Sequence, residues 1–407
     1  MMHNFDVIVV GGGASGFFTA LNLAESNPQL RIAILERGKD VLSKVKISGG
    51  GRCNVTHACF IPNVLTKFYP RGERELRGPF SAFCTGDVMQ WFDDRGVALK
   101  IEEDGRVFPE SDSSQTIIDC FLQEAKQADI KIITQTIVQD VTKEGEEWQL
   151  QTTKDTFICN YLVMATGSNS KVWDLCTSLG HQIVAPVPSL FTFNTKDERL
   201  QDLMGVSAPM VSLRVKNSTL KANGPLLITH WGLSGPAILR LSAWGARELF
   251  DKSYQFDLMV NWTNDYVFDE VLEELMENKT ENPKKTIAKY PQYNLTHRLW
   301  QHLVKAAEIA ETMTWADVSK KNIVKLSEQL TQCTFTINGK STFKEEFVTA
   351  GGIDLKEVNF KTMESKLVDN LYFTGEILNI DAITGGFNFQ NAWTTGFLAA
   401  QAIASKY

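Results

Sequence analysis

Residues 6–16 read DVIVVGGGASG, and this stretch decides the fold. Asp6 to Val10 is a short run rich in β-branched residues, as in a buried parallel strand. The run enters a Gly-x-Gly-x-x-Gly pattern directly, and helical spacing begins at Phe17. This order predicts a dinucleotide site, because glycines let the backbone approach a pyrophosphate and the helix N-terminus attracts its charge. The predicted contacts in the turn are Gly11, Gly13, Ala14, Ser15 and Gly16.

A second strand with an acidic end favours the same site. After Asn27 and Pro28 break the helix, residues 31–35 form an apolar strand that ends at Glu36. A carboxylate at this place accepts the hydroxyls of an adenosine ribose and repels a 2′-phosphate. Glu36 and its neighbour Arg37 are therefore predicted cofactor contacts. Alone, the glycines could be an ordinary turn and Glu36 a solvated residue, but the full arrangement predicts dinucleotide binding.

Further strands predict a meander that returns to the parallel sheet. Strand composition marks residues 134–141, 147–152 and 156–165. The third of these strands ends in Ala-Thr-Gly, where a tight turn would again bring backbone close to the dinucleotide. The predicted contacts here are Val138, Ala165, Thr166 and Gly167.

The C-terminal sequence separates a flavin site from a site for NAD alone. A short strand at residues 371–374 is followed by two glycine segments and then by a helix marked by Ala392, Gly396, Ala399, Ala400 and Ile403. Paired glycines at a helix start leave N–H groups that can stabilise negative charge at the N1/O2 edge of a reduced flavin. The alternative is a helix merely capped by glycines. The predicted cofactor contacts are Gly375, Glu376, Asp381, Gly385, Gly386, Phe387 and Asn388.

Seven segments in this order resemble the BaiN-like or aminoacetone-oxidase-like family of bacterial flavoproteins: GGGASG, KISGGGRCNVT, GRVFPES, VMATG, THWGLSGPAILRLS, TAGGI and TGEILNIDAITGGFNFQNAWTTG. The resemblance spans nearly the whole chain. It implies an α/β fold with a glutathione-reductase-type FAD-binding Rossmann domain and an inserted substrate domain. It also implies FAD as a noncovalent cofactor.

The segment KISGGGRCNVTHA, residues 46–58, admits three interpretations. A zinc site lacks a compact fourth donor, so no metal ligands are assigned. A Walker loop would end in Gly-Lys-Ser/Thr, which is absent. The resemblance implies a flavin-contacting loop, in which glycines lie against the ring and Arg52 and Asn54 bond its heteroatoms or ribityl chain. The predicted contacts are Lys46, Ser48, Gly49, Gly50, Arg52, Cys53 and Asn54.

Three details of this region bear on chemistry. Cys53 could be a redox partner, but disulfide flavoenzymes normally present two closely spaced cysteines, so a small buried neighbour of the flavin is favoured. His57 replaces an asparagine expected in the family, and no catalytic role is assigned to it. Asp104-Gly105 predicts a two-residue hairpin between residues 97–101 and 106–108.

The domains are predicted as residues 1–188 with 346–407 for FAD, and 189–345 as an inserted substrate domain. Its β part covers about 189–262 and 333–345, and its helical part about 263–332. Within it, Thr229 to Pro236 (THWGLSGP) follows a strand and precedes a helix. His230 is predicted to be catalytic as a proton donor, together with Arg52 at the flavin. An ordinary strand-to-helix turn explains His230 equally well.

Composition excludes several classes of protein. The net charge is -7, so no broad basic face indicates nucleic acid or anionic membrane, and no dedicated nucleic-acid domain is expected. Seven cysteines, mostly scattered, argue against a disulfide framework and favour a cytoplasmic setting. No stretch approaches the roughly 20 apolar residues that cross a bilayer, so no membrane partner is expected.

The sequence therefore predicts a FAD-dependent oxidoreductase. The favoured reaction is NAD(P)H-dependent reduction of an activated C=C bond, in a steroid-like small molecule or in a uridine of ribosomal RNA, with NAD(P)H docking transiently as electron donor. The alternatives are a small-amine oxidase that uses dioxygen and a non-catalytic FAD-binding RNA-interaction or scaffold protein. Asn379 and Ala382 replace an expected aspartate and glycine, which leaves open whether Glu376 or Asp381 contacts the ribityl chain.

Overall fold

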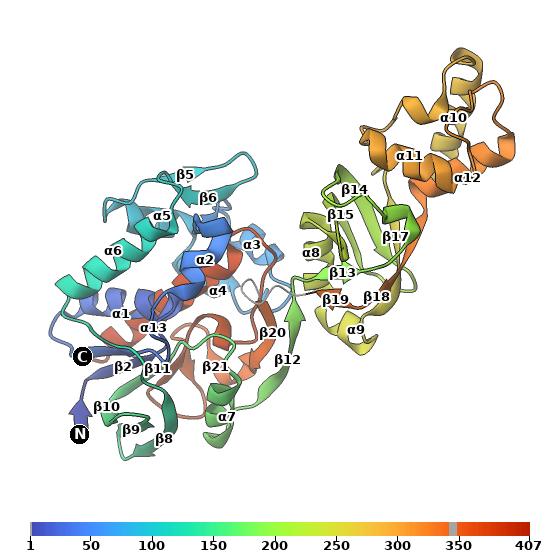
Figure 1. Cartoon of the computed structure of the whole chain (residues 1–407). Coiled ribbons are helices and arrows are strands. Elements are labelled where there is room, and N and C mark those ends of the chain that lie inside the picture. Colours follow the sequence, from blue (N-terminus) through green and yellow to red (C-terminus); the bar gives the residue numbers. More distant parts are fainter. Residues whose placement is uncertain (1, 342–347) are drawn as a thin grey trace. The chain divides into compact units, whose positions relative to one another are not determined.

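The computed structural model describes residues 2–341 and 348–407. The chain divides into two compact units, which Figure 1 shows in sequence colours. Unit 1 comprises Met1–Val187 and Lys344–Tyr407, and unit 2 comprises Pro188–Phe343. The predicted second boundary, at residues 345 and 346, lies outside the described residues.

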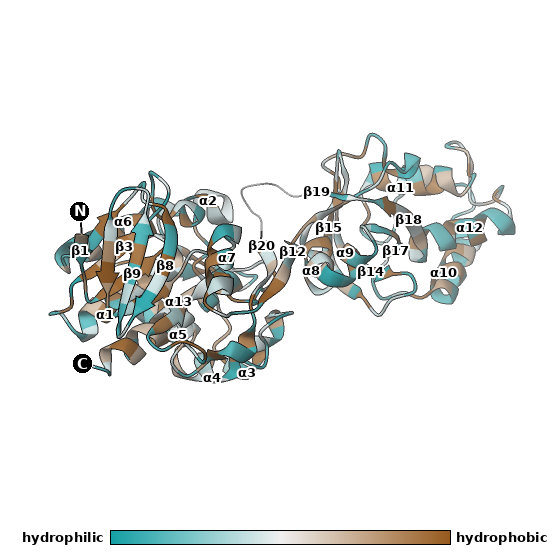
Figure 2. Cartoon of the chain, turned by 90° about the horizontal axis from the view of Figure 1, so that it is seen from below, coloured by the Kyte–Doolittle hydropathy of each residue, from teal (hydrophilic) through white to brown (hydrophobic). Residues whose placement is uncertain are grey.

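The centre of unit 1 is a seven-stranded sheet of order β21-β22-β23-β11-β2-β3-β7. Its strands are β2 (Val7–Val10), β3 (Ile32–Leu35), β7 (Lys131–Ile133), β11 (Tyr161–Met164), β21 (Val358–Asn359), β22 (Glu364–Ser365) and β23 (Leu371–Phe373). The five strands from β23 to β7 are parallel, and β22 and β21 continue the sheet antiparallel. Strands β2 and β3 are buried along their full length, as their apolar sequence predicts. Figure 2 shows the strand region around β3 as hydrophobic.

Helix α1 (Ala14–Ser26) packs on β2 and β3, α13 (Phe387–Ala404) contacts β23, and α6 (Ser114–Gln127) packs against α1. Figure 1 shows them together on one side of β2 and β11. An aromatic cluster joins these helices to the segment that carries Trp91: Phe18 of α1 lies 4.7 Å from Trp91 and 5.2 Å from Trp393 of α13 between ring centroids. Because α1 and α13 pack against each other, the two ends of the chain share one core.

A separate four-stranded sheet has the order β1-β10-β9-β8. Its strands are β1 (Met2–Asn4), β8 (Val138–Glu144), β9 (Glu147–Thr152) and β10 (Thr156–Cys159). The prediction of one strand over 156–165 is wrong, because β10 and β11 belong to different sheets. The chain passes between them at Asn160, where the N–H groups of Asn160 and Tyr161 both donate to the Asp6 carbonyl at 3.1 Å.

A three-stranded sheet of order β4-β6-β5 lies among short helices. It consists of β4 (Thr56–His57), β5 (Leu99–Ile101) and β6 (Arg106–Pro109), and the helices are α2 (Ser43–Gly51), α3 (Pro62–Leu65), η1 (Thr66–Phe68), α4 (Arg77–Ala82) and α5 (Thr85–Asp93). The hairpin predicted at Asp104-Gly105 is present between β5 and β6, but the predicted two-residue loop is wrong. Glu102 N–H still bonds the Arg106 carbonyl at 2.9 Å, so the loop is residues 103–105, and Gly105 supplies a left-handed φ of 83°.

The remaining elements of unit 1 surround the C-terminal strands. They are α7 (Ser170–Ser178), η4 (Leu355–Glu357), η5 (Gly375–Ile377), and the strands β12 (Ile183–Ser189) and β20 (Val348–Ile353), which pair with each other. Trp173 of α7 donates from Nε1 to the Ile377 carbonyl at 3.1 Å, and this bond joins α7 to η5.

Unit 2 is built on a seven-stranded antiparallel sheet of order β18-β17-β14-β15-β16-β13-β19. The strands are β13 (Thr192–Asn194), β14 (Ser207–Val215), β15 (Lys221–Thr229), β16 (Gly232–Ser234), β17 (Gln255–Asn261), β18 (Cys333–Asn338) and β19 (Lys340–Ser341). The helical elements are η2 (Glu198–Leu200), α8 (Pro236–Trp244), α9 (Ala246–Asp251), α10 (Phe268–Glu281), η3 (Ile287–Lys289), α11 (His297–Ala306) and α12 (Lys320–Thr331). Buried Trp262, Trp300 and Trp315 belong to one core that joins sheet and helices.

Candidate functional site

The glycine turn joins β2 to α1, and two of its glycines are required by packing. A Cβ at Gly11, which has a φ of 114°, would lie 2.4 Å from the Ala165 carbonyl oxygen. A Cβ at Gly16 would lie 2.0 Å from the Gly11 carbonyl oxygen, so only glycine lets α1 approach this closely. At Gly13, the N-cap of α1, a Cβ would meet nothing within 4 Å. Open space therefore faces the helix start, where Ala14, Ser15 and Gly16 present N–H groups without intrahelical partners.

Glu36 follows β3 and faces this turn. Its Oε2 accepts from the Gly12 N–H at 2.9 Å, and its Oε1 accepts from the Gly38 N–H at 2.6 Å. Its backbone carbonyl accepts from the Thr136 N–H at 2.9 Å, which brings the segment before Val138 alongside. Arg37 is exposed next to it. The carboxylate lies where a ribose beside the turn would find an acceptor.

The ends of β11 and β23 contribute two buried hydroxyls without partners. Thr166 Oγ1 and Thr374 Oγ1 have no hydrogen-bond partner among the described residues. Ser15 Oγ donates to the Thr374 carbonyl at 3.3 Å, and a Cβ at Gly375 would lie 2.6 Å from Ser15 Oγ. Both orphaned hydroxyls follow adjacent parallel strands at their carboxyl ends, the edge of an open sheet where nucleotides bind.

Glu376 extends this edge toward α2. Its Oε2 pairs with Lys44 Nζ at 2.5 Å, and a Cβ at Gly167 would lie 3.6 Å from the same oxygen. Lys44 belongs to the first turn of α2 and had no distinguishing signal in the sequence. The pair brings predicted residues Gly167 and Glu376 together.

The segment predicted as a loop over residues 46–58 begins inside α2. Lys46 is exposed, and its carbonyl accepts from Ser114 Oγ at 2.7 Å. The helix is interrupted at Ser48, and Gly49, Gly50 and Gly51 follow with left-handed φ values of 57°, 69° and 85°. A Cβ at Gly50 or Gly51 would meet nothing within 4 Å, so this backbone borders open space. Three successive residues of this kind require glycine.

Cys53 and Asn54 are internal to this segment. Cys53 is fully buried, and burial raises the pKa of its thiol to about 12. With its amide oriented to match its neighbours, Asn54 donates to the Thr56 carbonyl at 2.9 Å and accepts from the Gly386 N–H at 3.0 Å. Asn54 therefore joins this segment to the second glycine pair.

Arg52 is held by carboxylates. Its Nη1 lies 2.7 Å from Glu102 Oε1 and 3.2 Å from Asp112 Oδ1, and its guanidinium lies 3.8 Å from the Phe108 ring centroid. These bonds raise the pKa of Arg52, with Glu102 as the main cause. The predicted role of Arg52 at a flavin stays a prediction.

The second glycine pair opens α13. Gly386 is the N-cap with a φ of 90°, and a Cβ there would lie 2.5 Å from the Thr56 backbone. Phe387 stacks on Phe68 at 4.4 Å between ring centroids. Asn388 Oδ1 accepts from the Ala382 N–H at 3.0 Å, which closes the preceding loop onto the helix. The first turn of α13 thus presents N–H groups, as α1 does.

Sequence reasoning missed Arg71. The Asp381 side chain is fully buried and forms a bidentate pair with Arg71, whose Nε donates to Asp381 Oδ1 at 2.5 Å. The pair holds the loop before Gly385 rather than presenting a free carboxylate. Tyr69 Oη adds a bond to the Phe387 carbonyl at 2.5 Å. No motif surrounds these residues in the sequence, and only their burial reveals them.

His230 belongs to unit 2, at the two-residue turn between β15 and β16. It is exposed, its ring centroid lies 4.4 Å from that of Trp231, and Trp231 is 50% exposed. A Cβ at Gly232 would lie 2.3 Å from the Phe193 carbonyl oxygen, so the turn geometry is fixed by glycine. The structure places an imidazole and an indole together at this tip.

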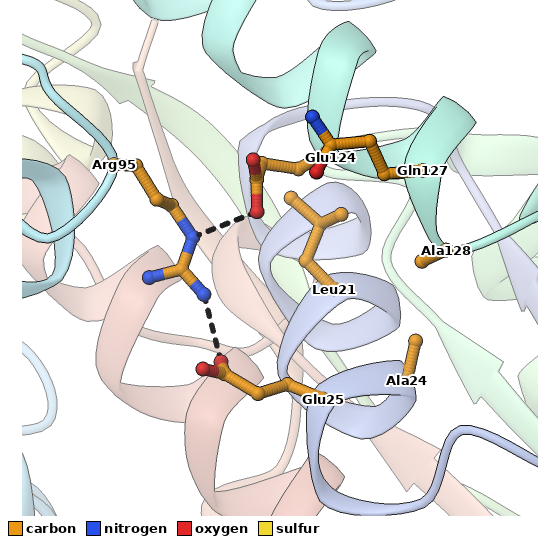
Figure 3. A pocket seen from close by; sticks show the side chains of 7 residues that line it. All are labelled: Leu21, Ala24, Glu25, Arg95, Glu124, Gln127 and Ala128. Atoms are coloured by element: carbon orange, nitrogen blue, oxygen red, sulfur yellow. Dashed lines mark hydrogen bonds and ion pairs between the residues drawn. The ribbon is translucent and has the colours of Figure 1, made fainter.

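A hollow of about 220 Å³ is lined by residues that do not belong to the glycine segments (Figure 3): Leu21, Ala24, Glu25, Arg95, Glu124, Gln127 and Ala128. Arg95 crosses it, with Nη2 2.7 Å from Glu25 Oε2 and Nε 3.3 Å from Glu124 Oε2. The Arg95 guanidinium and the Glu25 and Glu124 carboxylates of this hollow are ion-paired with one another, so their charges are already balanced. Within residues 2–341 and 348–407, no group of three His, Cys, Asp or Glu side chains could hold a metal ion. In the same part of the chain, no helix is long and apolar enough to span a bilayer.

These features fit a dinucleotide with a flavin. Open space at Gly13, the Glu36 carboxylate and the orphaned Thr hydroxyls lie at the sheet edge, and the N-termini of α1 and α13 present N–H groups of the kind that bind anionic groups. Residues 5–402 match the HI0933-like protein Rossmann domain. The chain belongs to this family. The resemblance to BaiN-like flavoproteins and the predicted α/β fold with a Rossmann domain and an inserted domain are confirmed, and the family is one of FAD-dependent oxidoreductases.

Relatives of this HI0933-like protein match it end to end. It is 28% identical to the ribosomal RNA dihydrouridine synthase of Haemophilus influenzae, over 98% of each chain. It is 24% identical to the 3-dehydro-bile acid delta(4,6)-reductase of Clostridium scindens, again over 98% of each chain. The fold is similar to that of the 3-ketosteroid-delta4-(5alpha)-dehydrogenase from Rhodococcus jostii RHA1, with a TM-score of 0.53, 14% identity and coverage of 99% of this chain and 97% of that one.

Proposed function

We propose that this HI0933-like protein binds FAD noncovalently in unit 1 and uses it to reduce an activated C=C bond. The observation that carries the proposal is the meeting of the Gly13 opening, the Glu36 carboxylate and the unpartnered Thr166 and Thr374 hydroxyls at one sheet edge. Such an edge suits the adenosine and pyrophosphate of a dinucleotide.

Different segments of unit 1 would bind different parts of FAD. The turn from Gly11 to Gly16 and the α1 N-terminus would hold the pyrophosphate, and Glu36 the ribose. The Gly50 and Gly51 backbone would lie beside the flavin ring, and N–H groups after Gly386 would face its N1/O2 edge. A bound flavin supplies hydride transfer, for which the protein provides position, electrostatics and a proton.

The names of the two relatives support reduction of a C=C bond. A dihydrouridine is a uridine with two hydrogens added across one C=C bond, and a delta(4,6)-reductase acts on C=C bonds of a bile acid. We therefore propose an activated C=C bond as the substrate, in a ribosomal RNA uridine or a steroid-like small molecule. NAD(P)H would dock transiently as the electron donor.

Anaerobic stopped-flow absorbance tests the reductase. Rapid bleaching of the flavin band on mixing with NADPH or NADH supports it. Inertness to both, with bleaching by small amines, would overturn it in favour of an amine oxidase. Bound flavin that no donor reduces would instead indicate a non-catalytic FAD-binding protein.

RNA mass spectrometry separates the two substrate classes. Loss of one dihydrouridine from ribosomal RNA after gene deletion, restored by the wild-type gene, supports the RNA uridine. An unchanged RNA mass spectrum rejects it and leaves the small molecule, which is then assayed with conjugated steroid enones.

His230 is the proposed proton donor. His230→Gln should lower the rate of substrate reduction by roughly 10² to 10⁴, the usual contribution of a general acid, while reduction of the flavin by NAD(P)H is kept. His297→Gln, an exposed histidine of the same unit on α11, is the matched control and should have no effect. Equal effects of both variants would remove His230 from the mechanism.

A further inference from the structure

His57 bonds directly to the glycine pair before α13. Its Nδ1 lies 3.2 Å from the Gly385 carbonyl oxygen. A carbonyl can only accept, so Nδ1 carries the hydrogen in this bond and Nε2 is the nitrogen that can gain or lose a proton. The bond links a titratable ring to the turn whose next residues present N–H groups at the α13 N-terminus.

Two aromatic rings and the 103–105 loop also contact the His57 imidazole. Its ring stacks on Phe387 at 4.5 Å between centroids and lies 5.9 Å from Phe68. A Cβ at Gly105 would lie 2.7 Å from His57 Nε2, so the 103–105 loop covers the titrating edge of the ring closely. His57 is half-buried, so the residue is not sealed from solvent.

The charges around His57 come from one hairpin. Burial lowers the pKa of His57 below its usual 6.5. The hydrogen bond to the Gly385 carbonyl and the charge of Asp104 partly oppose this shift, and Arg106 adds to it. The elements η1 and α13 present the uncharged rings of Phe68 and Phe387. The neutral imidazole is thus favoured while no further negative charge lies nearby.

We propose that His57 takes up a proton when the flavin is reduced and thereby compensates negative charge at the N1/O2 edge. The inference rests on the proposed function, which puts that edge at the N–H groups following Gly386. Reduction adds two electrons and one proton to the ring system, leaving one negative charge, and His57 Nε2 binds one further proton from solvent. No atom passes between the two groups. Because such coupling is reciprocal, protonated His57 favours the reduced state equally.

Histidine NMR on the flavin-loaded protein tests the coupling directly. With isotope-labelled imidazoles, the His57 resonance is identified by its loss in His57→Asn. We expect its proton affinity to rise at least tenfold between the oxidised and the dithionite-reduced protein. His302 is the internal control, since its Nδ1 also lies 3.2 Å from a backbone carbonyl, that of Arg199 in unit 2. A change at His57 under twofold, or an equal change at His302, would overturn the proposal.

Redox titration across pH gives an independent readout. The wild-type midpoint potential should fall more steeply with pH than that of His57→Asn, by up to about 30 mV per pH unit, the value of one extra proton in a two-electron couple. His57→Phe keeps ring stacking and should follow the asparagine variant. Identical slopes in all three proteins would overturn the proposal while bound flavin still supports the proposed function. If the protein binds no flavin, the proposed function itself is contradicted.

Discussion

Glu36 Oε2 accepts the Gly12 N–H at 2.9 Å, so one carboxylate joins the end of β3 to the glycine turn after β2. The two strands are paired in parallel, and their carboxyl ends lie together. A single side chain therefore helps to hold the turn and also lies where a ribose would bind.

Replacing Glu36 by alanine should weaken FAD binding by roughly tenfold to a hundredfold, because a hydrogen bond to a charged group contributes about 1.5–3 kcal/mol. Isothermal titration of the apoprotein with FAD measures the change. Glu25→Ala, in the hollow of Figure 3, is the matched control and should leave affinity unchanged. A larger loss of FAD affinity in Glu25→Ala than in Glu36→Ala would show that the nucleotide does not bind beside Glu36.

Two alanine substitutions in the glycine turn should separate binding from folding. Gly13→Ala adds a methyl group to open space, so the protein should keep its unfolding midpoint while losing FAD affinity. Gly16→Ala places a Cβ 2.0 Å from the Gly11 carbonyl oxygen and should lower stability by about 1–3 kcal/mol or more. Urea unfolding of the apoproteins, with FAD titration, gives both quantities. Equal losses of stability would contradict the assignment of Gly13 to the ligand.

Breaking the Arg71–Asp381 pair should destabilise unit 1 strongly. Arg71→Met leaves the fully buried Asp381 carboxylate without its main partner, a change that costs about 3–5 kcal/mol. Lys67→Met is the control, because Lys67 pairs with Glu73 while remaining 63% exposed. Urea unfolding measures both, and similar stabilities would show that the buried pair contributes little.

Cys53 should resist thiol reagents in the folded protein. Burial raises the pKa of its thiol to about 12, so almost no thiolate exists near neutral pH. Partly exposed Cys59 should react first, and Cys53 only after unfolding. Mass spectrometry after brief alkylation identifies the modified residue. Early labelling of Cys53 would revive a redox role for it.

His181 should make the protein less stable in mild acid. Burial lowers the pKa of His181 below 6.5, although its Glu357 partner at 3.0 Å opposes the shift. The unfolded chain then binds more protons than the folded one, so stability is lost as pH falls through 6.5 toward the folded pKa. Between about pH 7.5 and 5.5 the free energy of unfolding should fall more in wild type than in His181→Gln. An equal fall in the free energy of unfolding of both proteins would show that a group other than His181 causes the acid sensitivity.

The sequence predicted those features that have local causes. Gly11, Gly16 and Gly386 are glycines because neighbouring backbone leaves no room for a Cβ, and such a requirement leaves a visible pattern. Glu36 was found by its spacing from the turn. The break between β10 and β11 was not, because apolar residues on both sides of Asn160 read as one continuous strand.

The contacts that were missed join segments far apart in the chain. Arg71 reaches Asp381, and Lys44 reaches Glu376, across more than 300 positions of sequence. Neither cation stands in a motif, and a single basic residue in an otherwise ordinary stretch gives no sign of its partner. Asn54 and Asp381 stay predicted cofactor contacts, and in the structure both side chains also bond to other parts of the protein.

The position of β11 between β2 and β23 has a consequence for biosynthesis. Strands β2, β3 and β11 are synthesised early. Strand β23, which pairs with β11 on the side opposite β2, is synthesised only after all of unit 2. Until then β11 is an unpaired, apolar edge strand of the nascent sheet, and such an edge can associate with other chains. We therefore expect a chaperone that covers this sheet edge in the first 187 residues to raise the yield of native protein.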